Sequence, residues 1–230
     1  MNRRTWLAFA LGGAAWRGAG AAALAAEARP VGGIDSVIWD ATGELLIAQS
    51  TRERLIVEAE PAVLARIVSE VRQNRLHLRF GPGNIQTQHP IRFRLDVRAL
   101  SLLETRGSGA VRIGPLATPA LSLRLGGNDD LRLERLQAES VDTRMDGAGE
   151  VIIGAGRVDR QNVHIGGSGT YHAPGLDSRL TVAAIDGSGE IRVAASERLD
   201  ARISGSGEVL YRGRPQVVRT VTGAGDVRPL

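Results

Sequence analysis

The stretch that decides the fold runs from Gln161 to Val193 and reads QNVHIGGSGTYHAPGLDSRLTVAAIDGSGEIRV. It contains Gly-Ser-Gly at Gly167 and again at Gly187, and similar strings recur along the second half of the chain. The strings begin at Gly107, Gly127, Gly147, Gly167, Gly187, Gly205 and Gly223, at spacings of 20, 20, 20, 20, 18 and 18 residues. Repetition at such a period indicates a solenoid in which each repeat forms one coil.

Apolar residues flank the glycines at fixed distances. Four residues after the first glycine stand Val111, Leu131, Val151, Tyr171, Ile191, Val209 and Val227. Two residues before it stand Thr105, Leu125, Met145, Ile165, Ile185, Ile203 and Val221. Polar residues alternate with these positions, and alternation with a period of two indicates half-buried strands. Each repeat is therefore interpreted as a strand, a glycine corner, a second strand and a variable return segment.

Stacking of these repeats predicts an all-β fold, a right-handed parallel β-helix (β-solenoid) with rungs of about 20 residues. A glycine corner is expected wherever the backbone needs a positive φ or approaches the next rung closely. Asp129 replaces the second glycine of one corner, and we expect it to adopt the left-handed region that Asp tolerates. The predicted structural turn glycines are Gly107, Gly109, Gly127, Gly147, Gly149, Gly167, Gly169, Gly187, Gly189, Gly205, Gly207, Gly223 and Gly225.

The first half of the chain lacks the glycine corner but still alternates apolar and polar residues, as in the strand 91–97. We expect residues 34–100 to form an irregular N-terminal part and residues 101–228 the repeat rungs of one domain, 27–230. Pro61 suits a first helical position, and the apolar residues after it have helical spacing. A short helix near 61–72 is therefore predicted to cap the open end of the solenoid.

Residues 1–26 have the features of an export signal. Arg3 and Arg4 precede a short apolar stretch, and the small residues of Ala23-Leu24-Ala25 suit cleavage after Ala25 or Ala26. The signal is either of the twin-arginine type or an ordinary secretory one. We expect an exported protein of the periplasm, the cell surface or the medium, with no membrane span after signal removal.

Composition excludes several classes of function. Every one of the 29 basic residues is arginine, and without residues 1–26 there remain 26 arginines against 25 acidic residues. This balance, without basic runs interleaved with aromatics, argues against nucleic-acid binding. The chain has no cysteine, which excludes disulfides, thiolate metal sites and a cysteine nucleophile.

The order of parts resembles the head GIN domain family of auto-transporter adhesins. The resemblance rests on an early β segment (45–59), the string Arg75-Leu76-His77-Leu78-Arg79-Phe80, the strand 91–97 and the Gly107-Ser108-Gly109 string that follows it. It covers roughly residues 34–228. The family implies a right-handed parallel β-helix exported to the periplasm or cell surface, without catalytic residues that could be transferred to this chain.

One column of side chains suggests a surface site. The position three residues after the first glycine holds a carboxylate in five repeats, and alternation directs it outward, giving the ladder Asp130, Glu150, Glu190, Glu208 and Asp226. Such a ladder could bind divalent cations. A neighbouring column rich in arginine favours an ordinary solvated face instead. His164 and His172 flank one corner, and a metal site there is less favoured than two exposed histidines.

The serines of the Gly-Ser-Gly strings are interpreted as structural, because a nucleophile elbow needs a helix after the turn and a partner histidine. No catalytic, cofactor or metal site is predicted, and the chain is not expected to be an enzyme. We expect a non-enzymatic exported β-solenoid, an adhesin or an envelope module with a binding or structural role. Its ligand is unassigned, with a glycan or an envelope protein as the candidates. The alternatives are a glycan-active β-helix enzyme (lyase or hydrolase) and a periplasmic sensor or assembly partner.

Overall fold

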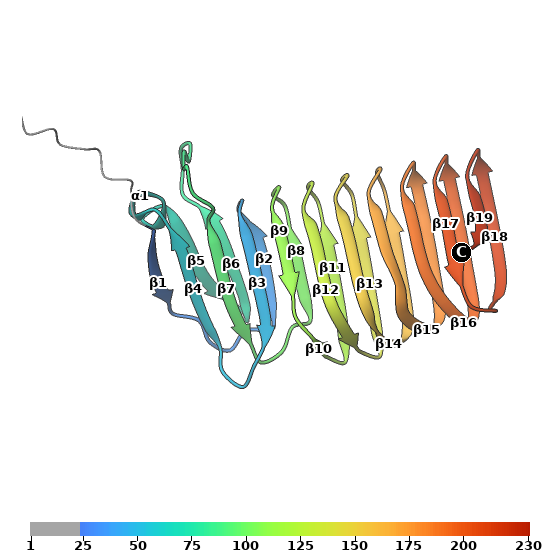
Figure 1. The fold of residues 1–230 in the computed structure, drawn as a ribbon, viewed down its shortest axis with the longest axis horizontal. Coiled ribbons are helices and arrows are strands. Elements are labelled where there is room, and N and C mark those ends of the chain that lie inside the picture. The colour runs from blue at the N-terminus through green and yellow to red at the C-terminus, as the bar shows by residue number, and fades with distance from the viewer. Residues whose placement is uncertain (1–23) are drawn as a thin grey trace, which may run out of the picture.

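The computed structural model describes residues 24–230, which form a long β-solenoid with one short helix (Figure 1). The predicted signal segment falls largely on residues 1–23, outside the described residues. Ala25 and Ala26, where we place cleavage, begin the first strand, β1 (Ala25–Arg29).

The coils have two faces, named here by their position relative to the glycine corner. The pre-corner face is ordered β5 (Ile67–Arg72), β6 (Arg75–Phe80), β2 (Ser36–Asp40), β8 (Leu102–Thr105), β11 (Ala120–Leu125), β13 (Ser140–Met145), the later parts of β14 (Glu150–Ile165), β15 (Thr170–Gly187) and β16 (Glu190–Gly205), and β18 (Gln216–Gly223). Apart from β5, neighbouring strands on this face are parallel.

The post-corner face begins with β1 and continues through β4 (Arg54–Ala59), β7 (Arg92–Val97), β3 (Glu44–Gln49), β9 (Ala110–Ile113), β12 (Asp130–Gln137), the earlier parts of β14, β15 and β16, β17 (Glu208–Arg212) and β19 (Asp226–Pro229). The short strand β10 (Leu116–Ala117) pairs with the end of β12 near the corner opposite the glycines, called here the second corner.

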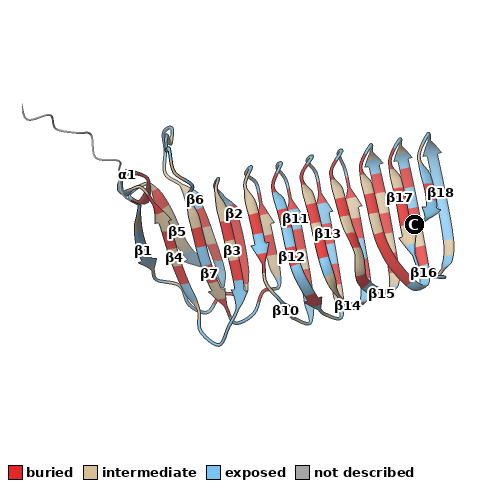
Figure 2. Ribbon diagram, in the orientation of Figure 1, coloured by how far each residue is buried: buried red, intermediate tan, exposed pale blue. Residues whose placement is uncertain are grey.

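The pairing register follows the sequence period, so the predicted parallel β-solenoid is confirmed. Leu125 lies beside Met145, twenty residues later, and Ile185 lies beside Ile203, eighteen residues later. The apolar columns beside the glycines fill the space between the two faces, which gives the alternating bands of Figure 2. Only the last coil departs from this pattern, since Val221 is 38% exposed there.

The N-terminal end is closed by antiparallel strands rather than by a long helix. β5 pairs antiparallel with β6, and β1 pairs antiparallel with β4, which pairs in the same sense with β7. A helix, α1 (Pro61–Leu64), begins at the predicted proline and connects the two faces, with Val63 and Leu64 buried. The predicted helix near 61–72 was therefore too long, because residues 67–72 form β5.

The competition between helix and strand in this segment explains the error. Ile67, Val68 and Val71 are β-branched, which favours a strand wherever a partner edge is available. The exposed edge of β6 supplies that partner, and β5 pairs with it from Ile67 to Arg72.

Close approach of neighbouring coils, rather than a positive φ, accounts for most corner glycines. A Cβ on Gly147 would lie 1.9 Å from the carbonyl oxygen of Gly127, and a Cβ on Gly187 would lie 2.4 Å from that of Gly167. Both glycines have φ values outside the left-handed region. Among the first glycines of the seven corners, only Gly205 and Gly223 have a positive φ. The corners therefore stack so tightly that a side chain at the first glycine has no room.

Asp129 has a different role from the one predicted. Its φ is not positive, so the left-handed interpretation was wrong. The side chain is completely buried and accepts hydrogen bonds from the backbone N–H groups of Gly107 (3.0 Å) and Gly109 (2.7 Å). It therefore satisfies backbone donors of the preceding corner, which itself stacks on the corner formed by residues 41–43.

A polar pair lies inside the apolar core. The Gln161 side-chain amide donates a 2.8 Å hydrogen bond to the hydroxyl of Tyr171, and both side chains are completely buried. Burial raises the pKa of the Tyr171 phenol well above its ordinary value, so the hydroxyl remains protonated. The pair joins the two strands that flank the Gly167 corner, across the interior of one coil.

Replacing Tyr171 with phenylalanine should lower the free energy of unfolding by about 1–3 kcal/mol, because the buried amide of Gln161 loses its acceptor. Urea unfolding measures the change. Tyr171→Phe combined with Gln161→Leu should recover part of the loss, because neither polar partner then remains unpaired. Tyr211→Phe is the matched control, since that hydroxyl has no hydrogen-bond partner among the described residues. Equal losses in both tyrosine variants would contradict the prediction.

Glu60, which directly precedes α1, forms hydrogen bonds with the loop before β7. One oxygen of its carboxylate accepts hydrogen bonds from the Gln88 backbone N–H (3.1 Å) and the Thr87 hydroxyl (3.2 Å), and lies 2.7 Å from Nδ1 of His89. These hydrogen bonds, the one from His89 above all, lower the pKa of Glu60 below its ordinary value of 4.5.

Glu60→Gln should therefore reduce stability at neutral pH and matter less in acid. A carboxylate with a lowered folded pKa contributes stability above its unfolded pKa, here 4.5, and that contribution is lost as the pH falls through the folded pKa. Melting temperatures of both proteins between pH 7 and pH ~3 test this. Replacement of the exposed Glu134 by Gln serves as the control. A difference in melting temperature between Glu60→Gln and the parent that does not change with pH would refute the expectation.

Candidate functional site on the outer surface of the solenoid

The structure aligns the predicted carboxylate ladder along the post-corner face. Glu150 lies beside Thr170, which lies beside Glu190, and the column continues to Glu208 and Asp226. At its start Asp130 lies beside Ala110, and its carboxylate accepts a 3.3 Å hydrogen bond from the backbone N–H of Glu150. All five carboxylates therefore share one outward column, separated only by Thr170.

Arginines of the next outward column bind part of this ladder. Arg192 contacts Glu190 at 2.6 Å, and Arg228 contacts both Glu208 (2.6 Å) and Asp226 (3.6 Å). The hydrogen bond and the charge of Glu190 raise the pKa of Arg192 further. Among residues 24–230, no group of three or more histidines or carboxylates is arranged to hold a metal ion. The ladder remains a prediction as a binding site.

Sequence reasoning missed the residue that extends the column toward the N-terminus. Glu44 lies beside Ala110, on the coil before the repeats, and binds Arg112 (2.9 Å) and Arg92 (3.2 Å). Glu44 directly follows Gly43, on which Gly109 stacks, but Ala41 stands where the later corners have their first glycine, so the repeat was not recognised there. The Gly43-Glu44 pair, like Gly149-Glu150, was the available signal.

The two histidines that flank the Gly167 corner lie on opposite faces. His164 belongs to the pre-corner column with Arg144 and Ala184, and its Nε2 lies 3.7 Å from the carboxylate of Asp186. His172 belongs to the post-corner column with Ile152 and Arg192. Outward side chains on opposite faces point away from each other, so the structure does not bring the two imidazoles together.

A hollow of about 650 Å³ lies at the second corner, opposite the glycines, where the coil length changes. Between β15 and β16 the register shifts after Ala173 and again after Ser178, because the later coil is two residues shorter. Residues 174–176 have no partner on β16 in this pairing. The shorter coil therefore turns earlier and leaves a step in the surface of the rod.

Small and buried side chains form the floor of this corner hollow. Val158, Ser178, Ala194 and Ala195 line it and are each no more than 5% exposed. The Ser178 hydroxyl lies 2.6 Å from the Ala194 carbonyl oxygen, to which it donates. A floor with short side chains leaves room above it for a ligand.

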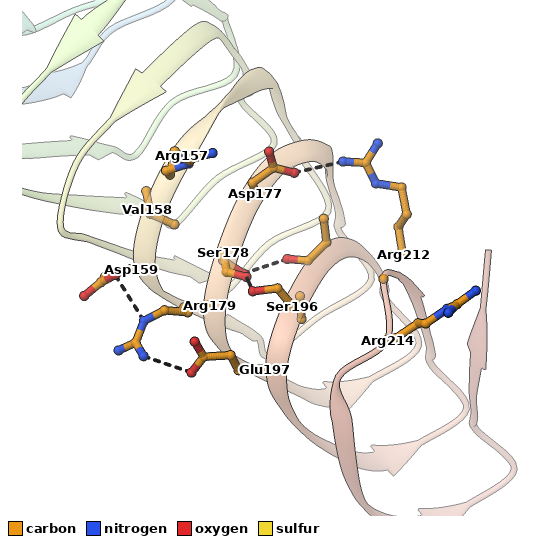
Figure 3. A pocket seen from close by; sticks show the side chains of 13 residues that line it. Arg157, Val158, Asp159, Asp177, Ser178, Arg179, Ser196, Glu197, Arg212 and Arg214 are labelled. Carbon is orange, nitrogen blue, oxygen red and sulfur yellow. Dashed lines mark hydrogen bonds and ion pairs between the residues drawn. The ribbon is translucent and has the colours of Figure 1, made fainter.

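Ion pairs form the walls of the corner hollow (Figure 3). Arg179 lies between Asp159 (3.3 Å) and Glu197 (2.9 Å), and the hydrogen bond from Arg179 to Glu197 is the main cause that raises the pKa of Arg179. On the other side Arg212 reaches past Ala194 to Asp177 at 3.0 Å.

Two further arginines line the corner hollow without an acidic partner. Arg157 projects from β14 and Arg214 follows β17, and both are exposed. Neither forms an ion pair within the part of the chain that the structure describes. The corner hollow thus has four arginines against three carboxylates, and two of the guanidinium groups are available to an anion.

Comparison with solved structures supports the fold. The chain is similar to a "putative adhesin" from Bacteroides fragilis (22% identity, TM-score 0.86), with 91% of this chain and 98% of that chain covered. It is also similar to a "putative adhesin" from Parabacteroides distasonis (18% identity, TM-score 0.72, 90% and 97% covered). A third match, titled "putative lipid binding protein", comes from the same species (22% identity, TM-score 0.69, 90% and 96% covered).

The chain has no significant match among curated proteins. In residues 24–230 no helix has the length and apolar character needed to cross a membrane. The family model described as "Putative auto-transporter adhesin, head GIN domain" matches residues 35–215, which is most of the chain. The expected resemblance is thereby confirmed, and this chain belongs to the head GIN domain family.

Proposed function

We propose that this chain is an exported, non-enzymatic binding module of the cell envelope that attaches to an extended ligand through the outer surface of its solenoid. The observation that carries the proposal is the post-corner face, on which acidic and basic columns run in register from coil to coil. A stiff surface with a repeating charge pattern suits a ligand that itself repeats, such as a polysaccharide.

Family membership supports the hypothesis that the chain is an adhesin, and the N-terminal sequence supports export. A glycan hydrolase, one form of the enzymatic alternative, would need a carboxylic acid that can donate its proton at the cleaved bond. In the corner hollow, each of the three carboxylates forms an ion pair with an arginine, and no unpaired carboxylate of the described residues lines the hollow. This favours binding over hydrolysis.

Binding of the purified chain to immobilised polysaccharides and to cell-envelope fractions tests the proposal. Saturable binding with no change in the length of the bound polymer, measured by size-exclusion chromatography, is the expected result. Shortening of the polymer would favour the enzymatic alternative, and absence of binding to every fraction would overturn the proposed function. Fractionation of cells that express the complete chain tests export, with a variant lacking residues 1–26 as control.

A further inference from the structure

The corner hollow has features that select among polysaccharides. It contains no aromatic side chain on which the face of a neutral sugar ring could stack. Its walls consist of charged groups, which disfavour an apolar ligand but offer donors and acceptors to hydroxyl groups. The excess of guanidinium groups over carboxylates favours a ligand that carries negative charge.

The two unpaired arginines are separated along the rod. Arg157 lies beside Asp177, which lies beside Ala194, which lies beside Arg212, two residues before Arg214. Since stacked coils are about 4.8 Å apart, these three steps span roughly 14 Å. Figure 3 shows the Arg157 and Arg214 side chains well apart on different sides of the hollow, an arrangement that suits a chain of several sugar units better than a single small anion.

We propose that the corner hollow binds an acidic polysaccharide whose sugar units carry carboxylates, with Arg157 and Arg214 each binding one carboxylate of the chain. Arginine presents two parallel N–H donors to a carboxylate, which gives both affinity and orientation. Asp159, Asp177 and Glu197 accept hydrogen bonds from sugar hydroxyls while remaining bound to their arginines. This inference rests on the proposed function and specifies its ligand class.

Titration calorimetry with polygalacturonate, with its carboxyl-reduced form and with dextran sulfate tests the proposal. The chain should bind polygalacturonate, and Arg157→Gln combined with Arg214→Gln should weaken that binding by about tenfold or more. The carboxyl-reduced polymer should bind no better than the double variant binds the acidic one. Because both arginines are exposed, the melting temperature should not change.

The matched control is Arg135→Gln combined with Arg202→Gln, which removes the same charge from exposed positions outside the corner hollow. An equal loss in this control would show a general charge effect and overturn the proposal. If the double variant loses as much affinity for dextran sulfate as for polygalacturonate, the assignment of a carboxylate ligand is overturned. If envelope fractions bind but the hollow variant binds them as well as the parent, the site is wrong and the proposed function stands.

Discussion

Replacing Gly147 with alanine should destabilise the protein by more than about 4 kcal/mol, a loss that few single substitutions cause. The added Cβ would lie 1.9 Å from the carbonyl oxygen of Gly127 and 2.9 Å from its carbonyl carbon, and both are backbone atoms that cannot rotate away. Relief requires that the two coils separate, which breaks hydrogen bonds on both sides of the corner. Thermal and urea unfolding measure the effect.

Gly126→Ala is the matched control. Gly126 precedes an equivalent corner, but its Cβ would come no closer than 3.6 Å to any atom, at the carbonyl oxygen of Thr105. Its φ is not positive, so alanine should be tolerated, with a gain of up to about 1 kcal/mol from reduced freedom of the unfolded chain. Gly187→Val should behave like Gly147→Ala for the same steric reason. Similar stabilities for Gly126→Ala and Gly147→Ala would contradict the close-approach account.

Deleting residues 61–72 should convert the protein from a soluble species into aggregates. The deletion removes α1 and β5, and β5 is the only partner that residues 24–230 place on the outer edge of β6. β6 would then present unpaired backbone groups next to the buried residues Leu76 and Leu78, an arrangement prone to edge-to-edge association. Light scattering and size-exclusion chromatography after refolding measure the outcome.

A deletion of residues 82–88 with a two-glycine replacement is the control for chain shortening. That segment contains no strand, and its residues are mostly exposed. It should leave the protein monomeric, although it also removes the hydrogen bonds of this loop with Glu60 and Arg66. A soluble monomer after deletion of 61–72 would show that the N-terminal end needs no cover from this segment.

Periodicity was sufficient to predict the repeat region, because the spacing between corner glycines equals the sequence offset between residues that pair on neighbouring coils. Residues that occupy equivalent positions in the sequence, such as Met145 and Ile165, lie side by side in the structure. The antiparallel closure could not be predicted in this way. β1 finds its partner on β4, far along the chain, whereas β5 pairs with β6 across a two-residue turn at Gln73 and Asn74, and neither pairing has a period in the sequence.

The corner hollow was also missed, although its cause was visible. The glycine spacing falls from 20 to 18 residues after Gly187, and this shortening places the step at the opposite corner. What the spacing could not give is the lining of that step. Arg157, Asp177 and Arg212 come together only because four successive coils are stacked there.

Because neighbouring coils pair in a uniform way, one coil is a segment of sequence that could be duplicated or lost as a whole. Residues 127–146 contact the coils before and after them through the same pattern, with partners offset by a constant twenty residues. A tandem duplication of such a segment would add one coil and lengthen the rod by about 4.8 Å without disturbing other contacts. Relatives of different reach could therefore arise by gain or loss of whole coils, while the N-terminal closure and the corner hollow keep their structures.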